Sequence, residues 1–235
     1  MSIRINQYLS HAGVCSRRQS HAMIQEGRVF INDAHAQIGD LVNKEDVVYV
    51  DNKMINLPSK KVYYLYYKPR GIVTNMSMDK ANHIVHYIPQ VKGLYPVGRL
   101  DKMSEGLLLL TNDGILTNAL LSPFNNHEKE YRVIVDKPIT NEFINTLSSG
   151  VQIINTTTKP CEIKRVSSHE FDIVLTQGMN KQIRRMCQTM NYRVEKLVRT
   201  RILHLDWNLS EGTVKALSSE DVNRLYQSLN LSSHN

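Results

Sequence analysis

Short apolar runs, each closed by a turn signal, dominate the chain after residue 61. Val62–Tyr67 ends at Lys68-Pro69-Arg70-Gly71, and Leu107–Thr111 ends at Asn112-Asp113-Gly114. Runs rich in β-branched, aromatic or leucine residues indicate strands, and a continuous leucine run indicates a strand buried on both faces. Further runs follow at 72–74, 131–135, 163–166, 171–176, 193–198 and 202–207. Because few helices interrupt these runs, we predict an α+β domain with a largely antiparallel, mixed sheet.

Helix signals in this part of the chain are few. Thr140 is an N-cap residue for a helix that runs through Leu147, and Asn180 is placed to cap a helix over residues 180–190. A last helix is expected from Ser218 or Ser219 to about Leu229. These helices are too few to cover both faces of a parallel sheet.

The N-terminal part of the chain carries a separate pattern of two helices followed by strands. Apolar residues recur at helical spacing over residues 4–12, and the capping-box pair Ser16 and Gln19 begins a second helix. Strands are predicted at 29–31 and 47–50. A polar linker containing Pro58 follows at 56–61, so we predict two domains, 1–58 and 62–235.

The positive charge of the chain is concentrated in one segment. The chain holds 29 Lys and Arg against 22 Asp and Glu, a net charge of +7. Residues 181–201 hold seven of these basic residues against Glu195 alone, a net of +6. A local basic patch is expected of a nucleic-acid contact, and a solvated charged face is the alternative.

The helix expected over 180–190 places the basic residues of this segment on different faces. Its apolar stripe is formed at i, i+3, i+4 and i+7 by Ile183, Met186, Cys187 and Met190. Lys181 and Arg185 fall on the opposite face, and Arg184 lies on the flank, from which its guanidinium can reach a carboxylate. Cys187 is therefore predicted as a small core residue rather than a nucleophile.

A single carboxylate stands in a loop between two apolar runs. Asp101 is flanked by Arg99 and Lys102 and precedes the strand expected at 107–111. Positive neighbours favour the ionised form, and an ionised, partly buried carboxylate can act as a nucleophile or base. A structural ion pair that holds the loop is the alternative.

Several classes of protein are excluded or made improbable by composition. Hydrophobic residues make up 41% and charged residues 22% of the chain, a globular balance. The three cysteines are far apart without a C-x-x-C pair, which argues against a disulfide framework or a zinc ribbon. His83 and His86 are read as ordinary helix or loop content rather than metal ligands. The first residues show no apolar signal and no run approaches a membrane span, so we expect a cytoplasmic protein without membrane contact.

The segment RINQYLSHAGVCSRRQSHAMIQEGRVFIN, with the later GD and VNKEDVV, resembles the S4 RNA-binding domain. This resemblance implies a helix pair that packs against structured RNA. Arg17 and Arg18 would face phosphates, which would account for two arginines at a helix start where the dipole disfavours them.

Three further segments, GRLDKMSEGLLLLTNDG, HEKEYRVIV and QGMNKQIRRMC, resemble in this order and spacing the motifs of a pseudouridine synthase. With the S4-like module, they indicate the branch that acts on ribosomal RNA, the small-subunit-type A family. KEYRVIVDKPIT, TKPCEI and EKLVRTRI are most similar to the F-type enzymes of large-subunit (23S) rRNA. Met179 and Lys181 depart from the usual Leu and Arg, outside the catalytic positions.

The resemblance implies an isomerase that converts uridine to pseudouridine without cofactor or metal. Asp101 would be the nucleophile, Arg184 would pair with it, and Tyr131 would stack on the uracil. Without the resemblance, a core tyrosine is an equal reading of Tyr131. Ile183 would line the pocket, and Arg99 would fill the gap left by a flipped base. Contacts with the RNA backbone would come from Lys102, Lys181, Arg185, Arg199 and Arg201.

The partner implied is structured RNA, namely rRNA or also a tRNA. We expect a monomer with no obligate protein partner. The competing hypothesis is a non-catalytic S4-type RNA-binding factor for ribosome assembly, which would need the basic patch but not the set of Asp101, Tyr131 and Arg184.

Overall fold

The computed structural model describes residues 2–15, 17–58, 60–74, 83–88, 94–122, 125–206 and 209–232. The chain divides into two compact units. Unit 1 comprises Met1–Val62 with Gln90–Tyr95 and Asn112–Gly114, and unit 2 comprises Tyr63–Pro89, Pro96–Thr111 and Ile115–Asn235. The division at Val62 follows directly on the polar linker.

Unit 1 contains two helices after the short strand β1 (Ile3–Arg4), as the sequence predicts. α1 spans Ile5–His11 and α2 spans Arg17–Gln25; Ser16, predicted as its cap, lies outside the described residues. Two small antiparallel sheets follow, in the orders β1-β4 and β3-β2-β5-β6. Their strands are β1 (Ile3–Arg4), β2 (Val29–Ile31), β3 (Ala34–His35), β4 (Leu41–Val42), β5 (Val48–Val50) and β6 (Lys53–Ile55). Ile5, Leu9, Val29 and Val48, none of them exposed, centre the core of this unit.

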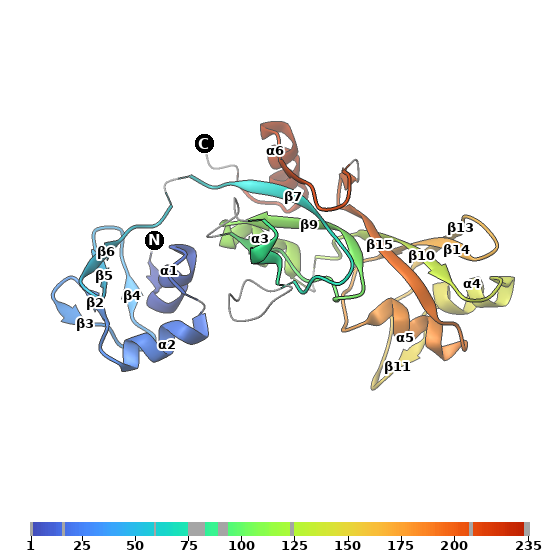
Figure 1. The fold of residues 1–235 in the computed structure, drawn as a ribbon, viewed down its shortest axis with the longest axis horizontal. Coiled ribbons are helices and arrows are strands. Elements are labelled where there is room, and N and C mark those ends of the chain that lie inside the picture. The colour runs from blue at the N-terminus through green and yellow to red at the C-terminus, as the bar shows by residue number, and fades with distance from the viewer. Residues whose placement is uncertain are drawn as a thin grey trace. The chain divides into compact units, whose positions relative to one another are not determined.

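Unit 2 is built on one large mixed sheet of nine strands (Figure 1). Its main path runs β13-β14-β10-β15-β9-β7-β17, with β16 on β15 and β8 on β9. β15 and β9 pair in parallel through only Val198↔Glu105 and Arg199↔Gly106, while the pairs β7·β9, β10·β15 and β10·β14 are antiparallel. The predicted α+β class with a largely antiparallel sheet is therefore confirmed.

The strands and helices of this part follow the sequence closely. The long strands are β7 (Tyr63–Lys68), β9 (Glu105–Thr111), β10 (Lys129–Val135), β13 (Glu162–Arg165), β14 (Glu170–Leu175) and β15 (Val194–Ile202). Short strands are β8 (Tyr95–Pro96), β11 (Gln152–Ile153), β12 (Thr156–Thr157), β16 (Leu205–Asp206) and β17 (Val214–Ala216). The helices are the 3₁₀ turn η1 (Ile84–His86), α3 (Gly114–Leu121), α4 (Asn141–Ser149), α5 (Gln182–Thr189) and α6 (Ser219–Ser228).

Two hydrophobic clusters occupy different parts of the sheet. The first joins β10, β14 and β15 to α4 and α5, with Val133, Phe143, Phe171 and Met186 fully buried. The second joins β7 and β9 to α3 and α6. In Figure 1, α4 and α5 accordingly lie beside the β10–β14–β15 end of the sheet.

Some predicted elements differ in the structure. The strand expected at 72–74 forms only an isolated bridge, Val73↔His83. Asn112-Asp113-Gly114 leads into α3 rather than into another strand, and Val194–Ile202 is one strand with β16 after it. Asn180 does not cap α5. Its N-cap is Lys181, in the left-handed conformation with φ 53° and no side-chain cap bond. Among the helices in the described ranges, none is long and apolar enough to cross a membrane.

Candidate active site

The loop that carries Asp101 is held in place by hydrogen bonds from several directions. The Thr74 hydroxyl donates to the Leu100 carbonyl at 2.8 Å and accepts from the Leu100 amide at 3.2 Å. Gly71 N donates to the Lys102 carbonyl at 2.7 Å, and Ser104 N donates to the Asp101 carbonyl at 3.0 Å. A fixed backbone at this position limits where the half-buried Asp101 carboxylate can lie.

Arg184 of α5 adds a further restraint on this loop. Its Nη2 donates to the Met103 carbonyl at 2.9 Å, and its Nη1 donates to the Val194 carbonyl at 2.8 Å. Burial lowers the pKa of Arg184, while the negative charge of Asp101 opposes that shift and the positive charge of Arg70 adds to it. The guanidinium is thus a charge close to Asp101.

The predicted ion pair between Arg184 and Asp101 is not formed. Within the described ranges no ion pair joins the two side chains, and the two hydrogen bonds of the Arg184 guanidinium go to backbone carbonyls. Arg184 does lie on the flank of α5, half-buried beside the buried Ile183, as the helical geometry predicts. Its observed role is to tie α5 to the loop of Asp101.

Lys68 is a second cation near Asp101, and sequence reasoning missed it. Its side chain has 0% exposure, and Nζ donates to the carbonyls of Pro69 at 2.7 Å and Ile72 at 2.9 Å. Burial lowers the pKa of Lys68 to about 8, against the opposing charges of Glu105 and Asp101. Glu105, itself buried, lies 3.1 Å from Lys196 Nζ. Nothing in the local sequence marks a lysine at a strand end as buried.

Tyr131 and Arg199 share a row of paired positions across the sheet. The register joins Lys68 to Gly106, Gly106 to Arg199, and Arg199 to Tyr131. Side chains at paired positions point to the same face, so Lys68, Arg199 and Tyr131 lie on one face with no side chain at Gly106. Tyr131 is half-buried and packs against the cluster that contains Ile183. This row places the tyrosine next to the buried Arg199 on one side and against the apolar cluster on the other.

Arg199 is not available to an RNA phosphate, contrary to the prediction. Its side chain is 3% exposed, and Nε donates to the Leu107 carbonyl at 2.7 Å. In the described part of the chain no group accepts a hydrogen bond from its buried Nη2. Its charge, together with burial, lowers the pKa of nearby Lys129 to about 8, burial being the larger cause. Arg199 is therefore an interior residue that joins β15 to β9.

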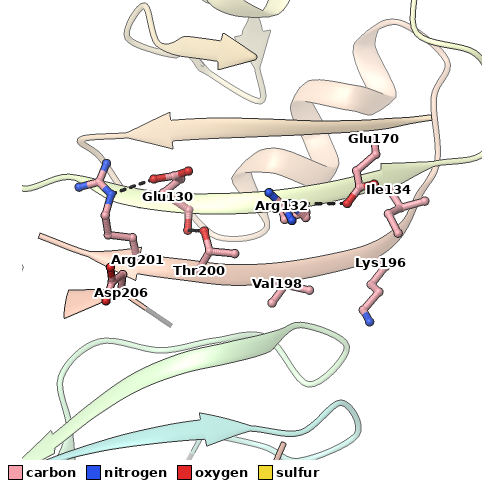
Figure 2. Close-up of a pocket in the computed structure, with 9 residues that line it drawn as sticks. All are labelled: Glu130, Arg132, Ile134, Glu170, Lys196, Val198, Thr200, Arg201 and Asp206. Carbon is pink, nitrogen blue, oxygen red and sulfur yellow. Dashed lines mark hydrogen bonds and ion pairs between the residues drawn. The ribbon is translucent and has the colours of Figure 1, made fainter. Parts of the chain in front are cut away.

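Arg201 is also engaged within the protein, on the opposite face of the sheet. It donates to Glu130 at 2.8 Å and to Glu128 at 3.0 Å. Together with residues of β10, β14, β15 and β16 it lines a cavity of about 480 Å³. Figure 2 shows it beside Glu130. Because β10 alternates, Glu130 and Arg132 face this cavity while Tyr131 faces the other side. The cavity is thus separate from the loop of Asp101.

The remaining predicted RNA-binding residues are accessible. Arg99, Lys102 and Lys181 are exposed, and Arg185 is half-buried with its Nη2 on Asn180 Oδ1 at 3.0 Å. Arg17 and Arg18 are exposed at the start of α2. Cys187 has 0% exposure, and burial raises its pKa to about 12, so its prediction as a core residue rather than a nucleophile is confirmed. The basic segment 181–201 is therefore only partly an outward surface.

Comparison with known proteins agrees with this arrangement. The RNA pseudouridylate synthase family model matches residues 62–189, and the S4 domain model matches residues 3–48. The chain is 43% identical over 235 residues to the dual-specificity RNA pseudouridine synthase RluF of Escherichia coli, covering 99% of this chain and 81% of that protein.

Two other relatives extend the match. The ribosomal large subunit pseudouridine synthase B of Bacillus subtilis is 32% identical over 234 residues, with 94% of this chain and 95% of that protein covered. A crystal structure of a pseudouridylate synthase superposes with a TM-score of 0.71 at 24% identity, covering 95% of this chain and 99% of that one, which shows a shared fold. The chain is therefore an enzyme of the RNA pseudouridylate synthase family, an isomerase with an N-terminal S4 domain.

Proposed function

We propose that this enzyme isomerises uridine to pseudouridine in ribosomal RNA, with the 23S rRNA of the large subunit as its principal substrate. The observation that carries the proposal is the half-buried Asp101 carboxylate, which has no ion pair within the described ranges. The loop that carries it is held by hydrogen bonds from Thr74, Ser104 and Arg184. The substrate class is supported by relatives named for RNA and for the large ribosomal subunit. A tRNA is a second candidate substrate, taken from the resemblance to the type-F enzymes.

In this proposal, Asp101 is the nucleophile that attacks the target nucleotide while its N-glycosidic bond breaks. The uracil then turns and rejoins the sugar through its C5 carbon while the bond to Asp101 breaks. The proton lost from C5 is balanced by one gained at N1, so the reaction needs no oxidant, no reductant and no second substrate. Lys68 and Arg184 both lie close enough to interact electrostatically with the Asp101 carboxylate. Tyr131 stacks on the uracil, and Ile183 behind it supports an apolar wall. The base must leave its stack to reach this site.

The S4 domain would hold structured RNA through Arg17 and Arg18. Arg99 and Lys102 would contact the RNA beside Asp101, and Lys181 and Arg185 would do so from α5. Binding of this kind releases counterions, so affinity would fall as the salt concentration rises. We further propose that the protein acts as a monomer, which sedimentation of the pure protein at micromolar concentration would test.

The test compares wild type, Asp101→Asn and the control Asp33→Asn on 23S rRNA, 16S rRNA and tRNA transcripts. Asp33 is an exposed carboxylate in the turn between β2 and β3. Carbodiimide adducts that resist alkali would map pseudouridine. We expect a new site with wild type and Asp33→Asn and none with Asp101→Asn, while all three bind the transcript with similar affinity.

Three outcomes would contradict parts of the proposal. Pseudouridine formation by Asp101→Asn at the rate of wild type would remove Asp101 as the nucleophile. Tight RNA binding by wild type with no adduct on any transcript would favour the ribosome-assembly factor instead. A site that appears only in tRNA would move the principal substrate to tRNA.

A further inference from the structure

Arg70 lies in a turn that the surrounding residues hold rigidly. Lys68 Nζ donates to the carbonyls of Pro69 and Ile72, one on each side of Arg70. Gly71 adopts φ +90°, and its N donates to the Lys102 carbonyl at 2.7 Å. This last bond ties the turn to the residue that follows Asp101. The backbone of Arg70 is therefore fixed beside the loop of Asp101, while the residue itself is exposed to solvent.

The charge of Arg70 lies within electrostatic range of Arg184. The positive charge of Arg70 adds to the effect of burial in lowering the pKa of Arg184. Two like charges at close range disfavour each other, and an anion placed between them would relieve that repulsion. Asp101 interacts with Arg184 but forms no ion pair with Arg70 in the described chain.

Arg70 differs in this respect from three arginines that are held in ion pairs, Arg28, Arg132 and Arg201. Arg28 lies 2.6 Å from Asp51, and Arg132 lies 2.9 Å from Asp172. Arg201, only partly exposed, lies 2.8 Å from Glu130. Within the described ranges Arg70 has neither a carboxylate partner nor a side-chain hydrogen bond. All five of its N–H donors are thus free to bind an external anion.

We propose that Arg70 binds a backbone phosphate of the RNA next to the target uridine, and so positions that nucleotide over Asp101. This inference rests on the proposed function for the identity of the polyanion. Arginine presents a planar fork that pairs with two phosphate oxygens, and phosphate contacts fix register without reading sequence. A flipped nucleotide brings its flanking phosphates to the rim of the site, which is where the turn 69–71 holds Arg70.

The test measures the affinity of an RNA transcript as a function of salt concentration. Fluorescence anisotropy would compare wild type with Arg70→Gln, Arg70→Lys and Arg224→Gln. The KCl concentration would run from about 50 to about 200 mM, where counterion release makes RNA affinity depend strongly on salt. Arg224 is the matched control, an exposed arginine on α6 without an ion pair in the described chain. Single-turnover pseudouridine formation at saturating enzyme gives the rate of the bound complex.

We expect Arg70→Gln to weaken RNA binding about tenfold at 100 mM salt and to reduce the slope of log K against log salt by about 0.7–0.9, the value for one phosphate contact. Arg70→Lys should keep most of the slope, and Arg224→Gln should behave as wild type. The saturating rate of Arg70→Gln should also fall, by about threefold or more, since Arg70 positions the target nucleotide over Asp101, while Arg224→Gln should keep the rate of wild type.

An unchanged slope and affinity in Arg70→Gln, equal to those of Arg224→Gln, would overturn this proposal even if wild type is fully active. A wild-type protein that binds RNA with the expected slope but forms no pseudouridine would instead contradict the proposed function. The two failures are therefore distinguishable in one set of measurements.

Discussion

Gly106 and Arg199 approach each other so closely that no other residue fits at position 106. A Cβ on Gly106 would lie 2.6 Å from the backbone nitrogen of Arg199 and would also collide with its carbonyl oxygen. Gly106 also adopts φ +104°, a conformation that L side chains rarely adopt. This contact is where β9 meets β15, next to the loop of Asp101.

Gly106→Ala is expected to destabilise the protein by about 1–3 kcal/mol, because the added methyl group forces two paired strands apart. Urea unfolding followed by circular dichroism measures this loss. Gly178→Ala is the matched control, since a Cβ at Gly178 meets nothing within 4 Å. Equal stability of the two variants would mean that β9 and β15 separate without cost.

Replacing Arg199 separates an interior role from an RNA-binding role. Arg199→Met loses the hydrogen bond to the Leu107 carbonyl. We expect a loss of about 1–3 kcal/mol in the free energy of unfolding and an unchanged salt slope for RNA binding. If the variant is stable and its slope of log K against log salt falls by about 1, Arg199 contacts an RNA phosphate after all.

Tyr131 can be tested for its stacking and hydroxyl roles separately. Tyr131→Phe keeps the ring and should bind RNA as wild type does, whereas Tyr131→Leu removes the stacking surface. If the hydroxyl assists proton transfer, Tyr131→Phe loses about 10²–10⁴-fold in kcat with little change in KM. A rate for Tyr131→Phe within about twofold of wild type would leave stacking as its contribution.

Lys68 predicts a specific pH dependence of stability. Its pKa is about 8 in the folded protein against an ordinary 10.5, mainly through burial, so between these pH values the unfolded chain holds a proton that the folded protein does not. Stability relative to Lys68→Met should therefore rise as the pH increases from about 8 to 10.5. Below pH 8 the lysine is charged in both states, and the cost of burying that charge is fully present.

Urea unfolding of wild type and Lys68→Met at pH 7, 8, 9 and 10 (roughly spanning this window) measures the difference directly. Taking the difference removes the similar contribution of Lys129, which both proteins retain. The neighbours of Lys68 that set its behaviour are Glu105, Asp101, Arg199 and Glu211. Parallel curves for the two proteins would show that Lys68 stays protonated in the folded state throughout.

The N-cap of α4 offers a test away from the site. Thr140 Oγ1 accepts from Phe143 N at 3.0 Å, and Phe143 has 0% exposure in the first cluster. Thr140→Ala should lower the free energy of unfolding by about 1 kcal/mol, and Thr140→Ser should restore most of it. Pseudouridine formation by Thr140→Ala below its melting transition should match wild type, since α4 contributes no residue to the loop of Asp101.

Local patterns were sufficient to predict much of the fold. The leucine run of β9, the alternation of β10, and the apolar stripe of α5 are periodic signals within one element, and each element formed. The placement of Arg184 on the flank of α5 followed from the same geometry. The cap at Thr140 was also predictable, because an N-cap depends on residues three positions apart.

Burial of charged side chains could not be predicted in the same way. Arg199 looks like a surface residue in a basic segment, and only the pairing of β15 with β9, 92 residues earlier, places it inside. Lys68 is buried by contacts with the turn that follows it and by the strands beside it. Asn180 failed as a cap because Lys181 turns into the left-handed region first, which the composition of the loop does not reveal.

The parallel contact between β9 and β15 has a consequence for how this sheet tolerates change. Within the described residues the strand ladder at this contact has only two residue pairs, and it connects a half whose core packs on α4 and α5 to a half whose core packs on α3 and α6. Substitutions in one core are therefore largely insulated from substitutions in the other, so their effects on stability should add. The two halves can diverge in sequence independently of each other. The contact between the two halves cannot change as freely, because position 106 must remain glycine to fit against the backbone of Arg199.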